Sequence, residues 1–148
     1  MVREIKFRGK SKKTRKWLYG YLGECKFSIL DYVYTDKVIF DNVLSFNTDN
    51  SAYVVKDLSV EEETIGQFTG LRDKNGNEIY EGDFVLINGQ IYEVVYNKGR
   101  FIIEVKGCGY IPLKNVVCQV RGNIHDNPEL MEDKSWNHLN VTVVSGSM

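Results

Sequence analysis

The stretch GQFTGLRDKNGNEIYEGDFVLI, residues 66–87, decides the fold, because it joins two apolar runs through a segment rich in glycines, amides and acids. Asn75-Gly76 is the favoured central pair of a type I′ hairpin turn, since both central positions of that turn require positive φ. Gly82 predicts a second bend with a backbone conformation that a side chain would forbid. We therefore expect the stretch to bend backbone between strands and to leave its acids in water.

A calcium loop is the main alternative interpretation of this segment. Asp73, Asn75 and Asn77 fit its first, third and fifth positions. The sixth position requires Gly and holds Glu78, whereas the twelfth requires a bidentate Glu and holds Phe84. Because both decisive positions fail, we predict no metal site and no cofactor.

Outward from this stretch, two-residue alternation of apolar side chains is common and helical periodicity is rare. Asn88-Gly89 and Asn97-Lys98-Gly99 predict further turns between the runs DFVLI, QIYEVVY and RFIIEV. Five short strands in residues 64–121 predict a small SH3-like barrel. Asn127-Pro128-Glu129 predicts the start of a short C-terminal helix, because Asn is a capping residue and Pro suits the first helical position.

The predicted fold class is all-β, with two small β units and a short C-terminal helix. We place an N-terminal β unit with a basic hairpin loop in residues 1–60, the SH3-like barrel in residues 61–132 and a tail in residues 133–148. Residues 27–56 contain the strand-like pieces FSIL, YVYT, KVIF and AYVV, whose order the sequence leaves open.

The chain of 148 residues, 43% hydrophobic and 26% charged, has the composition of a globular protein. Its apolar runs are far shorter than the roughly 20 residues of a membrane helix. No apolar run follows the N-terminal charges as it would in a secretory signal. Cys25, Cys108 and Cys118 form no CxxC pair, which favours reduced thiols. We expect a cytoplasmic location and no membrane partner.

The central segment GQFTGLRDKNGNEIYEGDFV resembles the signature of the YopX-like family of bacteriophage and prophage proteins. REIKFRGK near the start and VRGNIHDNPELM near the end resemble the opening and closing segments of that family. Residues 24–60 match no part of it, and Arg121 and His125 depart from its closing pattern. The resemblance implies a β-rich protein with an SH3-like portion, made in the bacterial host cytoplasm, and it implies no catalytic residues.

Charge is distributed unevenly along the chain. Residues 1–16 hold eight basic side chains and one acidic one, while the other 132 residues hold 11 basic and 19 acidic side chains. Cations beside aromatic rings are what a single-stranded nucleic acid requires, but the same rings also suit the inner face of a sheet or a subunit interface. The candidate contact residues are Lys10, Lys12, Lys13, Arg15, Lys16, Trp17, Tyr19 and Tyr21.

His125 and His138 have no partner at metal-ligand spacing, and no GxSxG nucleophile turn occurs. The leading hypothesis is therefore a non-enzymatic phage or prophage accessory protein that binds a host or phage protein. We also expect a homo-oligomer formed through the N-terminal hairpin, because a strand edge and an aromatic stripe favour association. The alternatives are a single-stranded nucleic-acid-binding protein that uses the basic hairpin, and an enzyme whose active site the sequence does not reveal.

Overall fold

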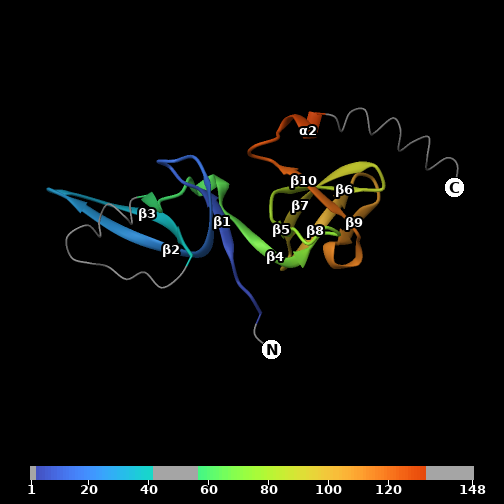
Figure 1. Cartoon of the computed structure of the whole chain (residues 1–148), viewed down its shortest axis with the longest axis horizontal. Coiled ribbons are helices and arrows are strands. Elements are labelled where there is room, and N and C mark those ends of the chain that lie inside the picture. The colour runs from blue at the N-terminus through green and yellow to red at the C-terminus, as the bar shows by residue number, and fades with distance from the viewer. Residues whose placement is uncertain (1–2, 42–56, 133–148) are drawn as a thin grey trace, which may run out of the picture. The chain divides into compact units, whose positions relative to one another are not determined.

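The computed structural model describes residues 3–41 and 57–132 of the chain (Figure 1). These residues confirm the all-β class, because they form two five-stranded sheets of antiparallel strands. The structure divides into the compact units Met1–Gly70 and Leu71–Met148. This division falls within strand β4 (Gly66–Arg72), whereas the sequence-based boundary lies between residues 60 and 61. The tail proposed for residues 133–148 lies outside the described residues.

The first sheet has the strand order β3-β2-β1-β4-β5. Its strands are β1 Phe7–Lys10, β2 Trp17–Ile29, β3 Tyr32–Phe40, β4 Gly66–Arg72 and β5 Glu78–Tyr80, and a 3₁₀ turn, η1 Glu62–Thr64, precedes β4. β1 lies between β2 and β4, with Phe7 opposite both Gly20 and Gln67. β1 and β2 therefore form the hairpin that carries the basic loop.

A long two-stranded ribbon extends from this sheet. Beyond Gly20, residues 21–29 of β2 pair, within the described part of the chain, only with β3, from Tyr21 opposite Phe40 to Ile29 opposite Tyr32. We call residues 21–40 the arm; Figure 1 shows its two strands running out together from β1. Gly20 marks its base: φ is 153°, and a Cβ there would lie 2.1 Å from the Phe40 carbonyl oxygen. The pieces FSIL, YVYT and KVIF lie in the arm, and AYVV lies outside the described residues.

The second sheet has the order β10-β6-β7-β8-β9. Its strands are β6 Asp83–Ile87, β7 Gln90–Asn97, β8 Arg100–Val105, β9 Gly109–Pro112 and β10 Gln119–Asn123, with the 3₁₀ turn η2 Leu113–Asn115 after β9. Asn88-Gly89 and Lys98-Gly99 form its two-residue turns, and all four residues have φ between 50° and 81°. The core of the unit Leu71–Met148 consists of Ile79, Val85, Val94, Ile103, Leu113 and Cys118.

Two features of the predicted C-terminal unit are not found. A closed SH3-like barrel requires its outer strands to pair, but among the described residues β10 pairs only with β6 and β9 only with β8. The prediction also counted β4 among the barrel strands, whereas β4 pairs with β1 in the first sheet. The predicted C-terminal helix is only a single turn, α2 Glu129–Glu132.

Asp73 organises the loop between β4 and β5. Its buried carboxylate accepts hydrogen bonds from the backbone N–H groups of Asn75 (2.9 Å), Asn77 (2.8 Å) and Val120 (2.9 Å), and from the Asn77 side-chain amide (3.2 Å). Gly76 has a φ of 84°, but the φ of Asn75 is not positive, so the predicted type I′ turn is wrong. The Asp73 N–H instead donates to the Asn77 carbonyl (2.8 Å) and closes a three-residue loop.

Asp83 and Gly82 fix the next bend. The Asp83 side chain is buried and accepts a hydrogen bond from the Tyr80 N–H at 2.8 Å. Gly82 has a φ of 86°; its N–H donates to the Val94 carbonyl (2.8 Å), and its carbonyl accepts from the Ile124 N–H (3.0 Å). The expectation that the acids of residues 66–87 stay in water is therefore wrong for Asp73 and Asp83.

Candidate functional site

The basic hairpin loop is tied to acids of its own unit. Lys12 Nζ lies 2.7 Å from Asp36 Oδ1, Lys13 Nζ lies 2.6 Å from Asp57 Oδ1, and Arg15 Nη1 lies 3.2 Å from Glu61 Oε1. The hydrogen bond to Asp36 raises the pKa of Lys12 above its usual value. Three of the candidate cations thus have a carboxylate partner with which a nucleic-acid phosphate would have to compete.

Trp17 contacts two cations of the neighbouring strand. The Arg8 guanidinium carbon is 4.7 Å and Lys10 Nζ is 5.5 Å from its ring centroid, and both contacts have cation–π geometry. Trp17 is half-buried and Arg8 is buried. The structure therefore brings Lys10 and Trp17 together, but their contact lies within the fold.

The remaining candidates of the hairpin are exposed. Lys16 ends the loop, and Tyr19 and Tyr21 follow on β2, with 46% and 56% of their surface accessible. The Tyr21 ring lies 5.9 Å from that of Phe40, its cross-strand partner at the base of the arm. Tyr21 thus belongs to the arm and not to the basic loop, and the eight candidate residues do not form one continuous platform.

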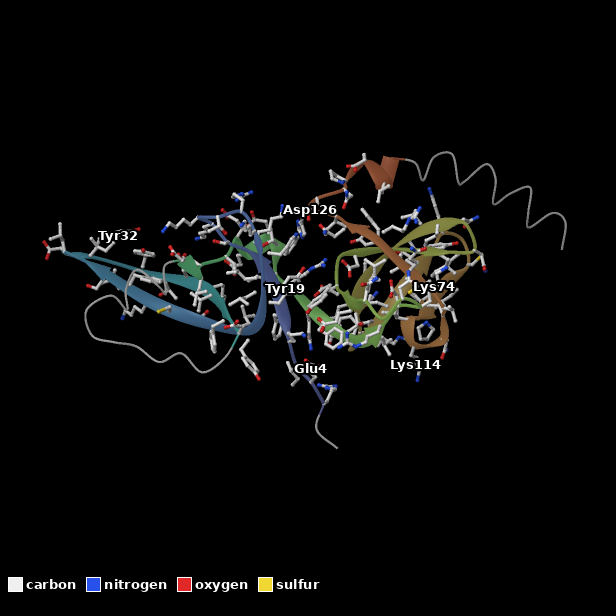
Figure 2. All side chains as sticks on the ribbon, in the orientation of Figure 1. Glu4, Tyr19, Tyr32, Lys74, Lys114 and Asp126 are labelled. Atoms are coloured by element: carbon white, nitrogen blue, oxygen red, sulfur yellow. The ribbon has the colours of Figure 1, made fainter. Side chains whose placement is uncertain are left out.

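The end of the arm, residues 29–33, exposes a group of large apolar side chains that sequence reasoning missed. Their accessible fractions are 51% for Ile29, 96% for Leu30, 69% for Tyr32 and 51% for Val33. Leu30 has a φ of 54°, in the turn between Ile29 and Tyr32. Figure 2 shows Tyr32 near the free end of the arm. We call residues 29–33 the arm end.

The arm has one apolar face. The rings of Phe27 and Tyr34 stack at 5.1 Å, and those of Tyr34 and Tyr32 lie 5.9 Å apart. Phe27 and Val38 are buried in a small cluster that also includes Leu58. Alternation in YVYT was a usable signal for this face. The Leu30-Asp31 turn, however, contains neither Gly nor Asn, so nothing in the sequence marks where β2 ends.

A polar hollow of about 250 Å³ opens beside the inner part of the arm. Its lysines both have acidic partners, since Lys12 pairs with Asp36 and Lys37 pairs with Glu24. The hollow is lined by Lys12, Glu24, Thr35, Asp36, Lys37, Val60 and Glu62. Two of its three acids therefore pair with its two lysines, and the walls keep one net negative charge that marks no particular ligand.

No three His, Cys, Asp or Glu side chains of residues 3–41 and 57–132 are placed to share a metal ion. Burial, together with the nearby charges of Asp73 and Asp83, raises the pKa of the Cys118 thiol, which favours its protonated form. His138 lies outside the described residues. None of the helices in the same part of the chain has both the length and the apolarity to cross a membrane.

These features define a small all-β protein with two five-stranded antiparallel sheets and a projecting arm whose end is apolar. The YopX protein family model matches residues 6–132, and the chain belongs to this family, which confirms the resemblance found in the sequence. The chain is also similar to protein EF1440 from Enterococcus faecalis, known from a crystal structure. Identity is 23% and the TM-score is 0.49, over 87% of this chain and 99% of that one. No curated protein matches the chain.

Proposed function

We propose that the chain is a non-enzymatic protein-interaction module of a bacteriophage or prophage, which acts in the cytoplasm of the bacterial host. Its arm end binds a host or phage protein. The exposure of Ile29, Leu30, Tyr32 and Val33 at the end of a projecting ribbon carries this proposal. Large aromatic and apolar anchors that enter a pocket of the partner supply most of the affinity at many protein interfaces.

The exposure of Leu30 supports a binding role for this residue. Leu30 has a φ of 54° at the first position of its turn, where Asn88 and Lys98 have a φ of 50° in theirs, so the backbone conformation alone does not distinguish it. The side chain of Leu30, however, is apolar and 96% exposed. Such exposure is unfavourable in the isolated chain, and clustered exposed apolar side chains mark interaction sites.

Charge favours a protein over a nucleic acid or a lipid surface as the partner of the arm end. Asp31 is the only charged residue among residues 27–35, so no cation there meets a phosphate or an anionic lipid. The competing hypothesis of a single-stranded nucleic-acid-binding protein relies on the basic hairpin, where Lys12, Lys13 and Arg15 are paired with acids.

Affinity capture followed by binding of the purified partner tests this proposal. The tagged full-length chain is used to capture proteins from nuclease-treated lysate of phage-infected cells, and the captured protein is then purified. We expect Leu30→Asp to weaken binding of that partner at least tenfold in calorimetry, because it replaces an apolar anchor by a charge. Val117→Asp is the matched control, since Val117 is 79% exposed and lies in the other unit. Equal affinity for both variants would contradict the proposal.

The nucleic-acid hypothesis has its own measurement. Fluorescence anisotropy of a labelled single-stranded DNA or RNA at low salt would show affinity that falls steeply with salt if the basic hairpin bound phosphates. We expect no such binding. Salt-dependent binding that is lost in Lys13→Ala would support the alternative and would overturn the assignment of the arm end as the principal site.

A further inference from the structure

One edge of β2 is paired near the start of the strand and open further along. β1 pairs with Trp17 to Gly20, and beyond that point residues 21–29 have no backbone partner on this edge among the described residues. An open row of N–H and C=O groups is a template for another strand. Residues 21–29 contain no proline, and β2 pairs with β3 along its other edge without a register shift, so neither a proline nor a bulge protects the open edge.

We propose that this edge pairs with the same edge of a second copy of the chain, antiparallel and centred on Cys25. The surface shares only Ile29 with the arm end, so the inference goes beyond the proposed function. Residues opposite one another on antiparallel strands lie on the same face of the sheet, and side chains alternate between faces. A symmetric pairing must therefore be centred on a residue and not between two residues. Cys25 is the midpoint of the open edge, and centring there pairs all nine residues 21–29.

The charges of Glu24 and Lys26 favour this register over the registers centred on the adjacent residues. Centred on Cys25, the pairing places Glu24 of each copy opposite Lys26 of the other, which is favourable. Centring on Glu24 or on Lys26 would place two like charges directly opposite, which is destabilising. Lys26 lies opposite Thr35 and makes no ion pair within the described part of the chain. The second copy places beside it Glu24, which also pairs with Lys37 of its own chain.

The apolar side chains fit the same register. Tyr21 and Ile29, which are 56% and 51% exposed in the single chain, come to lie opposite one another across the new pairing. They occupy the face that also carries Phe27. The result is a four-stranded sheet in the order β3-β2-β2-β3 that gathers these aromatic and apolar side chains on one face, which Asp36 opposite Cys25 shares. A two-stranded ribbon is marginal in water, and additional strands stabilise it.

Sedimentation equilibrium of the reduced full-length chain tests the pairing. We expect reversible dimerisation of the wild type, and at least tenfold weaker dimerisation for Lys26→Glu and for Glu24→Lys, since each sets like charges opposite. An equimolar mixture of these two variants should associate much more strongly than either variant alone, because every acid again faces a base across the new pairing, even though Glu24→Lys removes the partner of Lys37 within its own arm. Lys106→Glu, which makes the same charge change in a turn of the other unit, should dimerise normally.

Thiol oxidation tests the centre of the register. Opposed Cβ atoms lie about 4.5–5.5 Å apart on antiparallel strands, close to disulfide distance. In a Cys108→Ser background, which removes the exposed thiol, diamide should oxidise the two Cys25 thiols to an intermolecular disulfide. A covalent dimer on a non-reducing gel is expected, and it should be absent in Cys25→Ser and reduced in Lys26→Glu.

Three outcomes would overturn the inference. These are a monomer at every concentration, a dimer indifferent to both charge variants, and a mixture of the two variants that does not associate. If the chain is strictly monomeric but binds a partner through Leu30, the edge pairing is wrong and the proposed function is supported. If the chain dimerises but no partner binds in a way that depends on Leu30, the edge pairing is supported and the proposed function is contradicted.

Discussion

At the scale of single residues, Asp73 shows how one side chain accounts for the central motif. Its carboxylate accepts four hydrogen bonds, from Asn75, Asn77 and Val120. The spacing of Asp73, Asn75 and Asn77 resembles a calcium loop, but here backbone and amide N–H groups take the place of a cation. The sequence predicted a turn. It could not reveal the contact with Val120, which lies 47 residues away and depends on the tertiary fold.

We expect Asp73→Ala to lower the free energy of unfolding by about 3 kcal/mol, because it leaves several buried donors without an acceptor. Urea unfolding measures this change. Asp31→Ala, at the exposed arm end, is the control and should change stability by less than about 0.5 kcal/mol. A loss below about 1 kcal/mol for Asp73→Ala would contradict the structural role of this carboxylate.

The pH dependence of stability provides a second test of Asp73. Burial alone would raise the pKa of this carboxyl, but the hydrogen bonds from Val120, Asn77 and Asn75 outweigh it and hold the pKa below its ordinary value of 3.8. A depressed folded-state pKa contributes stability that is complete above the ordinary pKa and is lost as the pH falls through the folded-state value. We therefore expect the free energy of unfolding to fall more steeply below about pH 4 in the wild type than in Asp73→Asn. Parallel curves in urea titrations from about pH 2 to pH 6 would argue against this.

At the scale of elements, the arm depends on close backbone approach at its base. We expect Gly20→Ala to destabilise the arm by about 3 kcal/mol, because the added Cβ would lie 2.1 Å from the Phe40 carbonyl oxygen. Hydrogen exchange should show lost protection in residues 21–29 and 32–40. Gly70→Ala is the control, since Gly70 has a φ of 83° and free space around it, so only backbone strain of about 1 kcal/mol is added. Unchanged arm protection in Gly20→Ala would refute this role.

Hairpins with Asn-Gly chemistry could be predicted because the turn residues encode them locally. The pairings of β4 with β1 and of β10 with β6 could not, since they join segments that are distant in the sequence. The predicted barrel was wrong for this reason, because a run of short strands does not specify which sheet each strand joins. The arm end was missed because Leu30 occupies a turn position that local propensity assigns to Gly, Asn or Asp.

At the scale of the whole molecule, each unit has its own apolar cluster. We expect Ile103→Ala to destabilise the unit Leu71–Met148 by about 3 kcal/mol, because it leaves a cavity in the cluster around Val85 and Val94. Hydrogen exchange should rise in β6 to β8 and stay unchanged in the arm. Equal loss of protection in both regions would show that the two units unfold as one.

The continuity of β2 has a mechanical consequence. The strand runs without a break from its ladder with β1 to the arm end, and the hydrogen bonds of an antiparallel ladder lie perpendicular to the strands. A force that a bound partner applies to Leu30 along the direction of β2 therefore acts on the four residue pairs between β1 and β2 at the same time, in shear. The arm would resist such tension far better than a sideways force, which would open its hydrogen bonds one after another.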